Sequence, residues 1–335
     1  MSNSLVQISL VVPTYGRPKG LKRLLISLQE LGYMDRSSVE IIVADNNRDS
    51  KLRREVKDLC SSFEVRYVHE SRPGKSYAVN RGALLARGEY LAFTDDDTIA
   101  CQDDWLESMA KHFDELPELA YVSGNVVAAN TYNQLAKTWE DKGGLSKGRE
   151  RKYWSRDYLS SRRFMLKPWQ FNKICAGANC MVKRDVFIGV GMYNILLEGE
   201  PPFNAGATIE IGYRIVKAGY ELLYDPEVVI LHEHPESSED LLGKMFSYGL
   251  GDSGYQMSNF IGYRDYRCLW WSLIGHAGYT VKNKVLPRMV GKYPLPQKYI
   301  LAGLAGNLIG GPRFLFFYMR RGRKLLRDYE KETAR

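Results

Sequence analysis

Three consecutive carboxylates, Asp95, Asp96 and Asp97, follow an apolar run, Tyr90–Phe93, in the stretch YLAFTDDDTIACQDDW. Carboxylates this close raise one another's pKa unless a positive group joins them. Such a triplet can lie in a solvated turn, or it can hold a divalent cation, which prefers hard oxygen ligands. The triplet alone is compatible with both interpretations.

Polar, turn-forming residues also follow three other apolar runs that look like strands. These are PTYGRP after the first run, ADNN after the second and ESRPGKS after the third. In open α/β sheets, ligands bind beyond the carboxyl ends of the strands. We therefore expect four polar loops to meet at one edge of a sheet, which favours a binding site over a solvated turn that binds nothing.

Strand and helix patterns, which must position these loops, alternate regularly over the first 130 residues. Helical spacing is clearest in PKGLKRLLISLQELG, and no Walker A or GxGxxG motif follows the first strand. The alternation predicts an α/β fold with a mostly parallel sheet flanked by helices. The candidate strands are short and rich in β-branched residues: Ile8–Val12, Val39–Val43, Val65–His69, Tyr90–Phe93 and Ala120–Val127.

The composition is that of a globular protein, with 44% hydrophobic and 26% charged residues in a chain of 335. Five cysteines form no CxxC pair, which favours reduced thiols in a cytoplasm. The first residues, MSNSLVQISLVVPTYG, have none of the features of a signal peptide. We therefore expect a cytoplasmic location.

Six segments taken together resemble the family 2 glycosyltransferases, which have the GT-A fold. In chain order they are VVPTYGRP, VADNN, PGKSYAVNRGALLARGEYLAFTDDD, GANCMVKRDVF, GATIEIGYRIVKAGY and DPEVVILH. The resemblance covers roughly residues 7–235. It implies a Rossmann-like GT-A catalytic domain over residues 1–235, with a helical, basic region over residues 236–335.

The resemblance also implies an activity. Members transfer a sugar from a nucleotide-diphosphate donor to an acceptor hydroxyl, usually with inversion and with Mn²⁺ or Mg²⁺, so a hexosyltransferase of cell-surface glycan synthesis is expected. The acceptor would be a saccharide or a lipid-linked saccharide. Hydrogen bonding of Asp45 to the ring N–H of uracil would favour a UDP-sugar, although Asp45 could instead form a turn with Asn46 and Asn47.

The remaining site residues are assigned by the same resemblance. Pro13, Thr14 and Tyr15 would line the nucleotide base, and Lys75 would lie near the base or the phosphates. Asp95 would contact the ribose, Asp97 would bind the metal, and Asp96 stands between them. His232 would complete the metal–diphosphate site, or it could be a surface residue beside His234.

The pattern breaks where the family usually has an Asp general base in an ED pair before a helix. Here the pair reads Ala207 and Thr208, and Thr208 is expected to be a helix N-cap, not a base. Glu210 is the nearest carboxylate, although Arg214 at i+4 could simply pair with it. If an ancestral base has been lost, Thr208→Asp should raise transfer.

Three interpretations of this substitution remain open. Glu210, or another glutamate such as Glu198 or Glu200, could be the base. The enzyme could work without a conventional base. Alternatively, the protein could bind a nucleotide sugar at the membrane without transferring it.

The basic charge of the chain belongs to its tail, since residues 261–335 hold 15 Lys and Arg against 4 Asp and Glu. The run Tyr299–Met319 is nearly long enough to span a bilayer, but Asn307, Pro312 and Arg313 interrupt it. Aromatic residues such as Trp270 beside basic ones favour a peripheral anchor on the anionic inner face of the cell membrane. Packing on the catalytic domain or in a homodimer is the alternative. Nucleic acid is not expected, because no recognition module is present.

Overall fold

Strands of a mixed sheet form the centre of the computed structural model, which describes residues 6–129, 137–138, 140, 144–161, 168–199, 203–233 and 237–333. The strand order is β3-β2-β1-β4-β8-β6-β9-β5, and β7 pairs with β9. The strands are β1 (Ile8–Thr14), β2 (Val39–Asp45), β3 (Arg66–His69), β4 (Tyr90–Phe93), β5 (Thr98–Ala100), β6 (Leu119–Ala128), β7 (Lys152–Trp154), β8 (Cys180–Lys183) and β9 (Glu221–His232).

The α/β prediction is confirmed, and all five candidate strands form. The strands β1, β2, β3 and β4 are parallel, as expected, but β8 runs antiparallel between β4 and β6. Cys180, the first residue of β8, pairs with Phe93 at the end of β4. The chain therefore enters β8 at the edge where β4 ends, so this half of the sheet is mixed.

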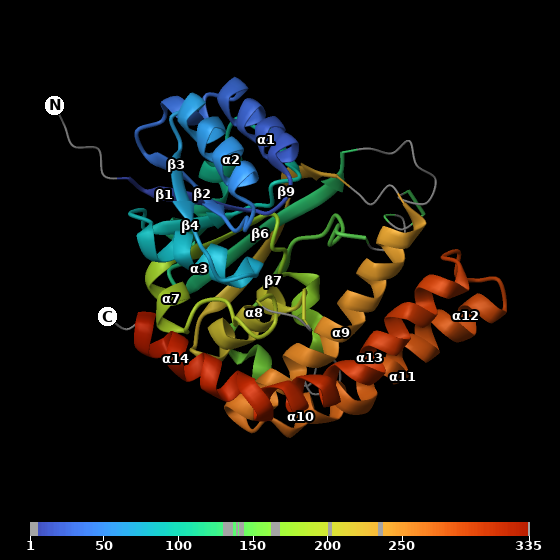
Figure 1. Cartoon of the computed structure of the whole chain (residues 1–335). Coiled ribbons are helices and arrows are strands. Elements are labelled where there is room, and N and C mark those ends of the chain that lie inside the picture. The colour runs from blue at the N-terminus through green and yellow to red at the C-terminus, as the bar shows by residue number, and fades with distance from the viewer. Residues whose placement is uncertain are drawn as a thin grey trace.

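Helices cover both faces of the sheet (Figure 1). Apolar side chains of α1 (Pro18–Glu30), α2 (Ser50–Ser62) and α4 (Trp105–Glu115) pack in one core. Those of α3 (Lys75–Leu85), α7 (Arg184–Gly189) and α8 (Ala207–Lys217) pack in the other. Within β1, Leu10 and Val12 belong to the first core and Val11 to the second, which is the alternation of a strand buried on both faces.

The C-terminal region is helical and lies against the sheet domain (Figure 1). It contains α9 (Ser238–Tyr263), α10 (Tyr266–Trp270), α11 (His276–Thr280), α12 (Leu286–Met289), α13 (Gln297–Phe317) and α14 (Arg323–Thr333). Three π-helical turns follow α10, α11 and α13 and join each to the next helix: η4 (Trp271–Gly275), η5 (Val281–Val285) and η6 (Tyr318–Gly322). Short 3₁₀ turns are η1 (Tyr33–Asp35), η2 (Arg156–Ser160) and η3 (Pro168–Lys173).

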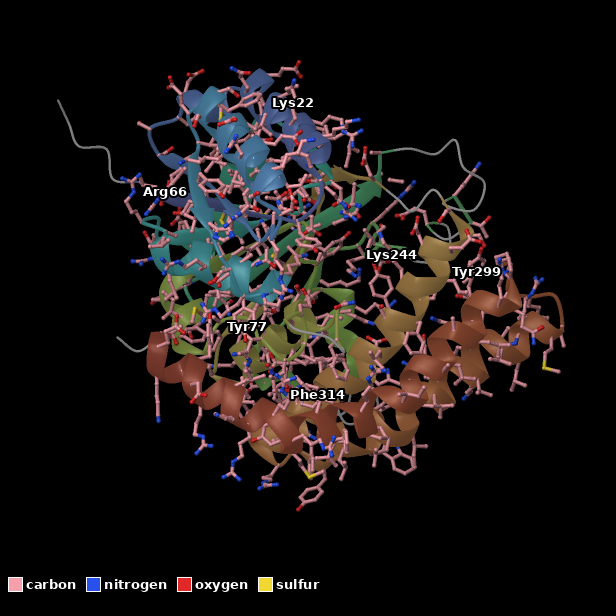
Figure 2. All side chains as sticks on the ribbon, viewed as in Figure 1. Lys22, Arg66, Tyr77, Lys244, Tyr299 and Phe314 are labelled. Carbon is pink, nitrogen blue, oxygen red and sulfur yellow. The ribbon has the colours of Figure 1, made fainter. Side chains whose placement is uncertain are left out.

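Packing of this region on the catalytic domain involves several rings. Phe314 of α13 lies 5.4 Å from Phe203, and Tyr329 of α14 lies 5.5 Å from Tyr77 of α3, centroid to centroid. Figure 2 labels Tyr77 and Phe314 on the two parts that meet. The tail is therefore packed on the catalytic domain, as one of the two alternatives had it.

The helices α9 and α13 approach each other closely through glycines. A Cβ on Gly306 of α13 would lie 2.3 Å from the backbone oxygen of Phe246, and one on Gly310 would lie 2.4 Å from that of Leu250. In the described chain, Gln297–Thr333 is one helical stretch long and apolar enough to cross a membrane by length and composition. Its glycine face, however, is the contact with α9.

Candidate active site

The Asp triplet lies in the turn between β4 and β5, at the carboxyl edge of the sheet. Register brings His232 to it, because Thr98 of β5 pairs with His232, the last residue of β9. The polar loops meet there as predicted. Gly16 donates its backbone N–H to Asn47, and Gly74 donates to Asn46 (2.7 Å each). The carboxyl-edge loops therefore form one hydrogen-bonded rim.

Three potential metal ligands converge at this rim. Asp95, Asp97 and His232 each offer a ligand atom, and these atoms lie within 4.8 Å of one another. The Nε2 atom of His232 is 3.2 Å from Asp97 Oδ1 and 3.9 Å from Asp95 Oδ2. Its Nδ1 lies 2.6 Å from the backbone oxygen of Glu233, which orients the ring towards the carboxylates. Two carboxylates and an imidazole suit a transition-metal dication such as Mn²⁺.

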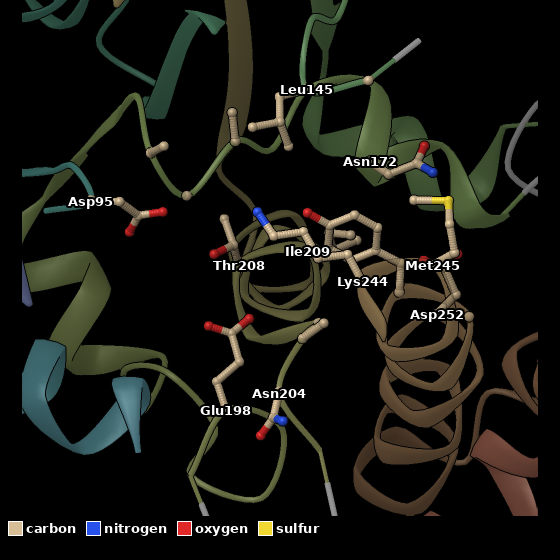
Figure 3. Close-up of a pocket in the computed structure, with 18 of the residues that line it drawn as sticks. Asp95, Leu145, Asn172, Glu198, Asn204, Thr208, Ile209, Lys244, Met245 and Asp252 are labelled. Atoms are coloured by element: carbon tan, nitrogen blue, oxygen red, sulfur yellow. The ribbon is translucent and has the colours of Figure 1, made fainter. Parts of the chain in front are cut away.

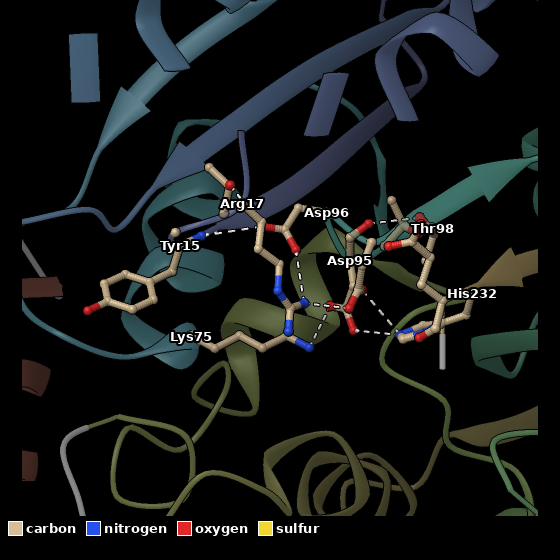
Figure 4. A network of polar contacts seen from close by, with 12 residues as sticks. Tyr15, Arg17, Lys75, Asp95, Asp96, Thr98 and His232 are labelled. Carbon is tan, nitrogen blue, oxygen red and sulfur yellow. Dashed lines mark hydrogen bonds and ion pairs between the residues drawn. The ribbon is translucent and has the colours of Figure 1, made fainter. Parts of the chain in front are cut away.

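Two cations keep the triplet together (Figure 4). Lys75 Nζ lies 2.6 Å from Asp95 Oδ1, while Arg17 pairs with Asp97 and lies 3.5 Å from Asp96. Burial would raise the pKa of Asp95, but the charges of Lys75 and His232 outweigh it and lower that pKa. Burial likewise opposes the raised pKa values of Lys75 and His232, which their carboxylate partners cause.

Asp96 has a different environment from its neighbours. Its Oδ2 accepts hydrogen bonds from the Thr14 hydroxyl (2.8 Å) and the Tyr15 backbone N–H (3.3 Å). Burial, followed by the charge of Asp97, raises the pKa of Asp96 to about 6. Asp96 thus holds the loop after β1 in place. Pro13 and Thr14 at the end of β1 and Tyr15 in that loop line a cavity, with the Tyr15 side chain largely exposed.

Asp45 does not face this cavity. Its side chain is fully buried, and its Oδ1 accepts hydrogen bonds from the backbone and side-chain nitrogens of Asn47 (2.8 and 2.7 Å). Its Oδ2 accepts from the Tyr67 hydroxyl (2.8 Å). In this arrangement both oxygens are used inside the protein, as in the Asx-turn alternative, so the structure offers Asp45 no access to a base.

The cavity beside the triplet has a volume of about 1420 Å³ and extends towards the C-terminal helices. Figure 3 shows Asp95, Thr208 and Glu198 pointing into one space from three different segments. Thr208 is buried, and its hydroxyl lies 3.5 Å from that of Tyr193. Thr208 lines the cavity. It is not the helix N-cap, however, because α8 begins after Gly206, which has φ 110°.

Glu198 reaches the cavity through a close approach of two loops. A Cβ on Gly74 would lie 2.3 Å from Gly199, and Ser76 donates its backbone N–H to the Glu198 carbonyl (2.8 Å). The Glu198 carboxylate accepts a hydrogen bond from the Ala207 N–H (3.0 Å) at the start of α8. Burial raises the pKa of this carboxyl above its ordinary value. Glu198 is therefore a carboxylate that lines the cavity and that burial makes more basic than an ordinary Glu.

Glu210 forms a buried ion pair with Arg214, which is the alternative that the sequence left open to its role as general base. It is 3% exposed and does not line the cavity. Its Oε2 accepts hydrogen bonds from Nε and NH2 of Arg214 (2.9 and 2.6 Å), and Arg214 also donates to the carbonyls of Val190 and Met192. The pair ties α8 to a neighbouring turn. Glu200 lies outside the described residues.

Several cavity residues were not singled out from the sequence. Arg17 lies in the segment PTYGRP, which follows the first strand, so the sequence could have indicated that it lines the site. Lys244 and Tyr248 of α9, and Lys147 of the segment after β6, also line the cavity. They come from segments outside the strand-end loops of the first half of the chain, and no local pattern marks them.

Comparison with known proteins places the fold and the family. The sequence model described as glycosyl transferase family 2 matches residues 9–191. A pre-mycofactocin glycosyltransferase of Mycobacterium tuberculosis is 23% identical over 72% of this chain, and the chain spans only 46% of that protein's length. The succinoglycan biosynthesis protein ExoM of Rhizobium meliloti is 27% identical over 72% of this chain and 71% of its own.

A solved structure supports the same architecture. The mannosyltransferase PcManGT of Pyrobaculum calidifontis, solved with GDP-Man and Mn²⁺, superposes with a TM-score of 0.57 at 16% identity, covering 92% of this chain and 87% of that one. At this identity the likeness concerns the fold, which is GT-A. With the family model covering more than half of the residues, the chain belongs to glycosyl transferase family 2.

Proposed function

We propose that this protein transfers a sugar from a nucleotide-diphosphate donor, with a UDP-sugar as the first to test, to a hydroxyl of a saccharide or lipid-linked acceptor. The supporting observation is that the Asp95–Asp97–His232 cluster and the Glu198 carboxylate share one cavity. A hexosyl transfer with inversion, in cell-surface glycan synthesis, is the specific reaction proposed.

In this proposal Asp97 and His232 hold a divalent cation, with Asp95 beside them. The donor set favours Mn²⁺ over Mg²⁺, because Mg²⁺ prefers oxygen ligands alone. When bound, the cation stabilises the negative charge that gathers on the leaving diphosphate. Lys75 and Arg17 supply further positive charge at the same edge.

The donor base is assigned to the end of β1 and the loop that follows it, and the ribose is assigned to Asp95. Pro13, Thr14 and the exposed Tyr15 ring line the base, and Asp96 keeps this loop next to the metal ligands. The choice of UDP rests on the family resemblance, since Asp45 is hydrogen-bonded within the protein. GDP is therefore the comparison nucleotide, as the mannosyltransferase neighbour was solved with GDP-Man.

Glu198 takes the role of general base in place of the missing Asp. It lines the cavity, while Thr208 has no basic group and Glu210 is bound to Arg214. Burial raises its pKa above that of an ordinary Glu, which makes the ionised carboxylate a stronger base. In this assignment Glu198 accepts the proton of the acceptor hydroxyl as the hydroxyl oxygen attacks the sugar.

A second candidate function is binding of the nucleotide sugar at the membrane without transfer. The observation that favours it is Thr208 at the position where the family usually has its base. Release of UDP in the presence of an acceptor separates the two functions, because only a transferase produces it.

Membrane association belongs to the proposal as well. The tail helices expose large apolar side chains that the protein itself does not cover, among them Trp270, Ile274, Met289 and Phe316. Basic residues flank them, including Arg320 and Arg321 in η6. Such a surface fits the headgroup region of an anionic leaflet, on the cytoplasmic face.

Calorimetric titration of UDP and GDP, each with and without Mn²⁺, tests the donor site. UDP should bind with Mn²⁺ present and far more weakly without it, and Asp97→Asn or His232→Ala should remove the metal dependence. Asp103→Asn, an exposed carboxylate in the next loop, is the matched control. Metal-independent binding, or no binding of either nucleotide, contradicts the proposed site.

A further inference from the structure

The cavity continues past the Asp triplet to an inner part between the sheet domain and the C-terminal helices. This part is lined by Lys147 and Asn172 from segments before β8, by Asp252 of α9, by His276 of α11 and by Lys284 of η5. The proposed donor site and base use none of them. The inner part is therefore a separate group of polar side chains in the same cavity.

Positive charge dominates this inner group. Burial lowers the pKa of Lys147 to about 8 and lowers that of Lys284, and it raises the pKa of Asp252 to about 6. Lys173 lies at the same wall but is exposed to solvent. Among the described residues, none of these side chains has an ion pair or hydrogen bond. The half-buried ammonium groups of Lys147 and Lys284 outnumber the one carboxylate whose charge acts on both, Asp252, and a bound anion would balance the remaining positive charge.

Two uncharged polar atoms in the inner part also have no partner. His276 is only 5% exposed, and its Nε2 has no hydrogen bond within the described structure. Burial, followed by the charge of Lys284, lowers the pKa of His276 to about 3, so its ring is neutral at pH 7. Asn172 Oδ1 is likewise buried and unpaired. Buried polar atoms in native proteins are normally satisfied by protein, water or ligand.

The helix α9 sets the distance between this inner group and the triplet. Lys244, Tyr248 and Asp252 are spaced four residues apart and all line the cavity, and Figure 3 shows Lys244 and Asp252 on this helix. The charge of Asp97 acts on Lys244, whereas those of Lys284 and Lys147 act on Asp252. Eight residues of α-helix rise about 12 Å. A group held by the inner lysines thus lies about two helical turns from the reacting centre.

We propose that Lys147, Lys284 and His276 bind a phosphate group of the acceptor, at a distance from the hydroxyl that reacts. The acceptor is then a phosphorylated or diphosphate-linked saccharide, whose phosphate anchors it while the hydroxyl lies near Glu198. This inference rests on the proposed function, because the bound molecule is an acceptor only if the triplet binds a donor.

The test compares decyl diphosphate with decyl glucoside, which have the same alkyl chain and differ in charge. UDP and Mn²⁺ are added first, at saturating concentrations, so that the diphosphate cannot enter the donor site. Affinity is measured by tryptophan fluorescence for the full-length protein. Decyl diphosphate should bind at least about tenfold more tightly than the glucoside. The double variant K147Q/K284Q should lose that preference, and the exposed pair K282Q/K292Q should keep it.

Methyl phosphate, a soluble monoester, distinguishes the two sources of a phosphate group. Binding that needs Lys147 and Lys284 supports the site, and it assigns a soluble phosphorylated acceptor. Lysine-dependent binding of decyl diphosphate alone also supports the site and assigns a lipid-linked acceptor. Equal affinity for the charged and neutral decyl ligands, or no effect of K147Q/K284Q, overturns the inference. Failure of UDP to bind in the first step counts against the donor site instead, so the two proposals fail separately.

Discussion

Glu198 and Glu210 illustrate how the fold separates two carboxylates that the sequence places twelve residues apart. Glu198 leaves a loop pressed against Gly74 and enters the cavity, while Glu210 points from α8 into a buried pair with Arg214. The sequence could name both as bases, because each lies near the lost Asp position. It could not choose between them, since the direction of a side chain near a helix start depends on tertiary packing.

Glu198→Gln should lower transfer by about 10²–10⁴-fold while the affinity for UDP stays the same, because an amide cannot take a proton. Gln can still accept the Ala207 N–H, so α8 keeps its capping contact. In the unmodified protein, activity should rise with pH through a pKa above that of an ordinary Glu, because only the ionised carboxylate is a base. Kinetics measured as a function of pH should show this rise in activity, and the Glu198→Gln variant should lack it.

Glu227→Gln, an exposed carboxylate on β9, is the control for this experiment. Thr208→Asp in the Glu198→Gln background should restore part of the transfer, since both side chains face the same space. If Glu198→Gln retains full activity and Thr208→Asp alone increases it, the lost-base interpretation is the better one.

At the scale of elements, α13 contains glycines that make it a poor isolated transmembrane span. Its close contact with α9 explains these glycines. Their missing side chains allow the two backbones to meet, so the helix is built for packing on one side. Its other side exposes Leu301, Leu308 and Phe316. The sequence could not predict that one side of α13 packs on α9 and the other is exposed, because an apolar helix with glycines has the same composition in a membrane or on a protein.

Gly306→Ala should destabilise the protein by about 1–3 kcal/mol, as overpacking does in a closely packed contact. The added Cβ would lie 2.3 Å from the Phe246 oxygen and 2.7 Å from the Leu250 nitrogen, and backbone atoms cannot rotate away. Thermal unfolding of the full chain measures the loss as a lower Tm. Gly303→Ala on the same helix is the control, since its nearest neighbour would be 3.6 Å away. Equal Tm values for the two variants would show that the helices are not in close contact.

The sheet was largely predictable, and its departures have local causes. Strands β1 to β4 follow from alternating apolar runs and helices, and the polar loops at their ends meet at one edge of the sheet, as predicted. The antiparallel β8 could not be foreseen, because its direction depends on where the preceding segment returns to the sheet. The inner lysines, Lys147 and Lys284, lie 137 positions apart in the sequence and meet only through the fold.

On the scale of the whole molecule, the exposed apolar side chains and the basic charge gather in the same C-terminal layer. The protein should therefore sediment with vesicles that contain phosphatidylglycerol, and weakly with purely zwitterionic ones. The double variant W270S/F316S should reduce this binding, since both rings are exposed and neither supports the core. High salt should weaken attachment without abolishing it, because aromatic insertion is not screened.

Leu116→Ser, an exposed apolar residue of the sheet domain, controls for surface hydrophobicity in general. Vesicle binding that W270S/F316S leaves unchanged would rule out this surface as the attachment site. Complete loss of binding in high salt would reduce the attachment to charge alone.

In the proposed donor site, the ion pairs of Lys75 with Asp95 and of Arg17 with Asp97 would couple the binding of the metal to that of the nucleotide. A divalent ion that binds these carboxylates must compete with both ion pairs. Its affinity for the protein is therefore low when no nucleotide is bound. A diphosphate offers the displaced lysine and arginine new partners and gives the ion further oxygen ligands. Each ligand therefore strengthens the other by the same factor. In this proposal the metal and the nucleotide bind together at modest concentrations, and either one alone binds far more weakly because it must compete with the internal ion pairs.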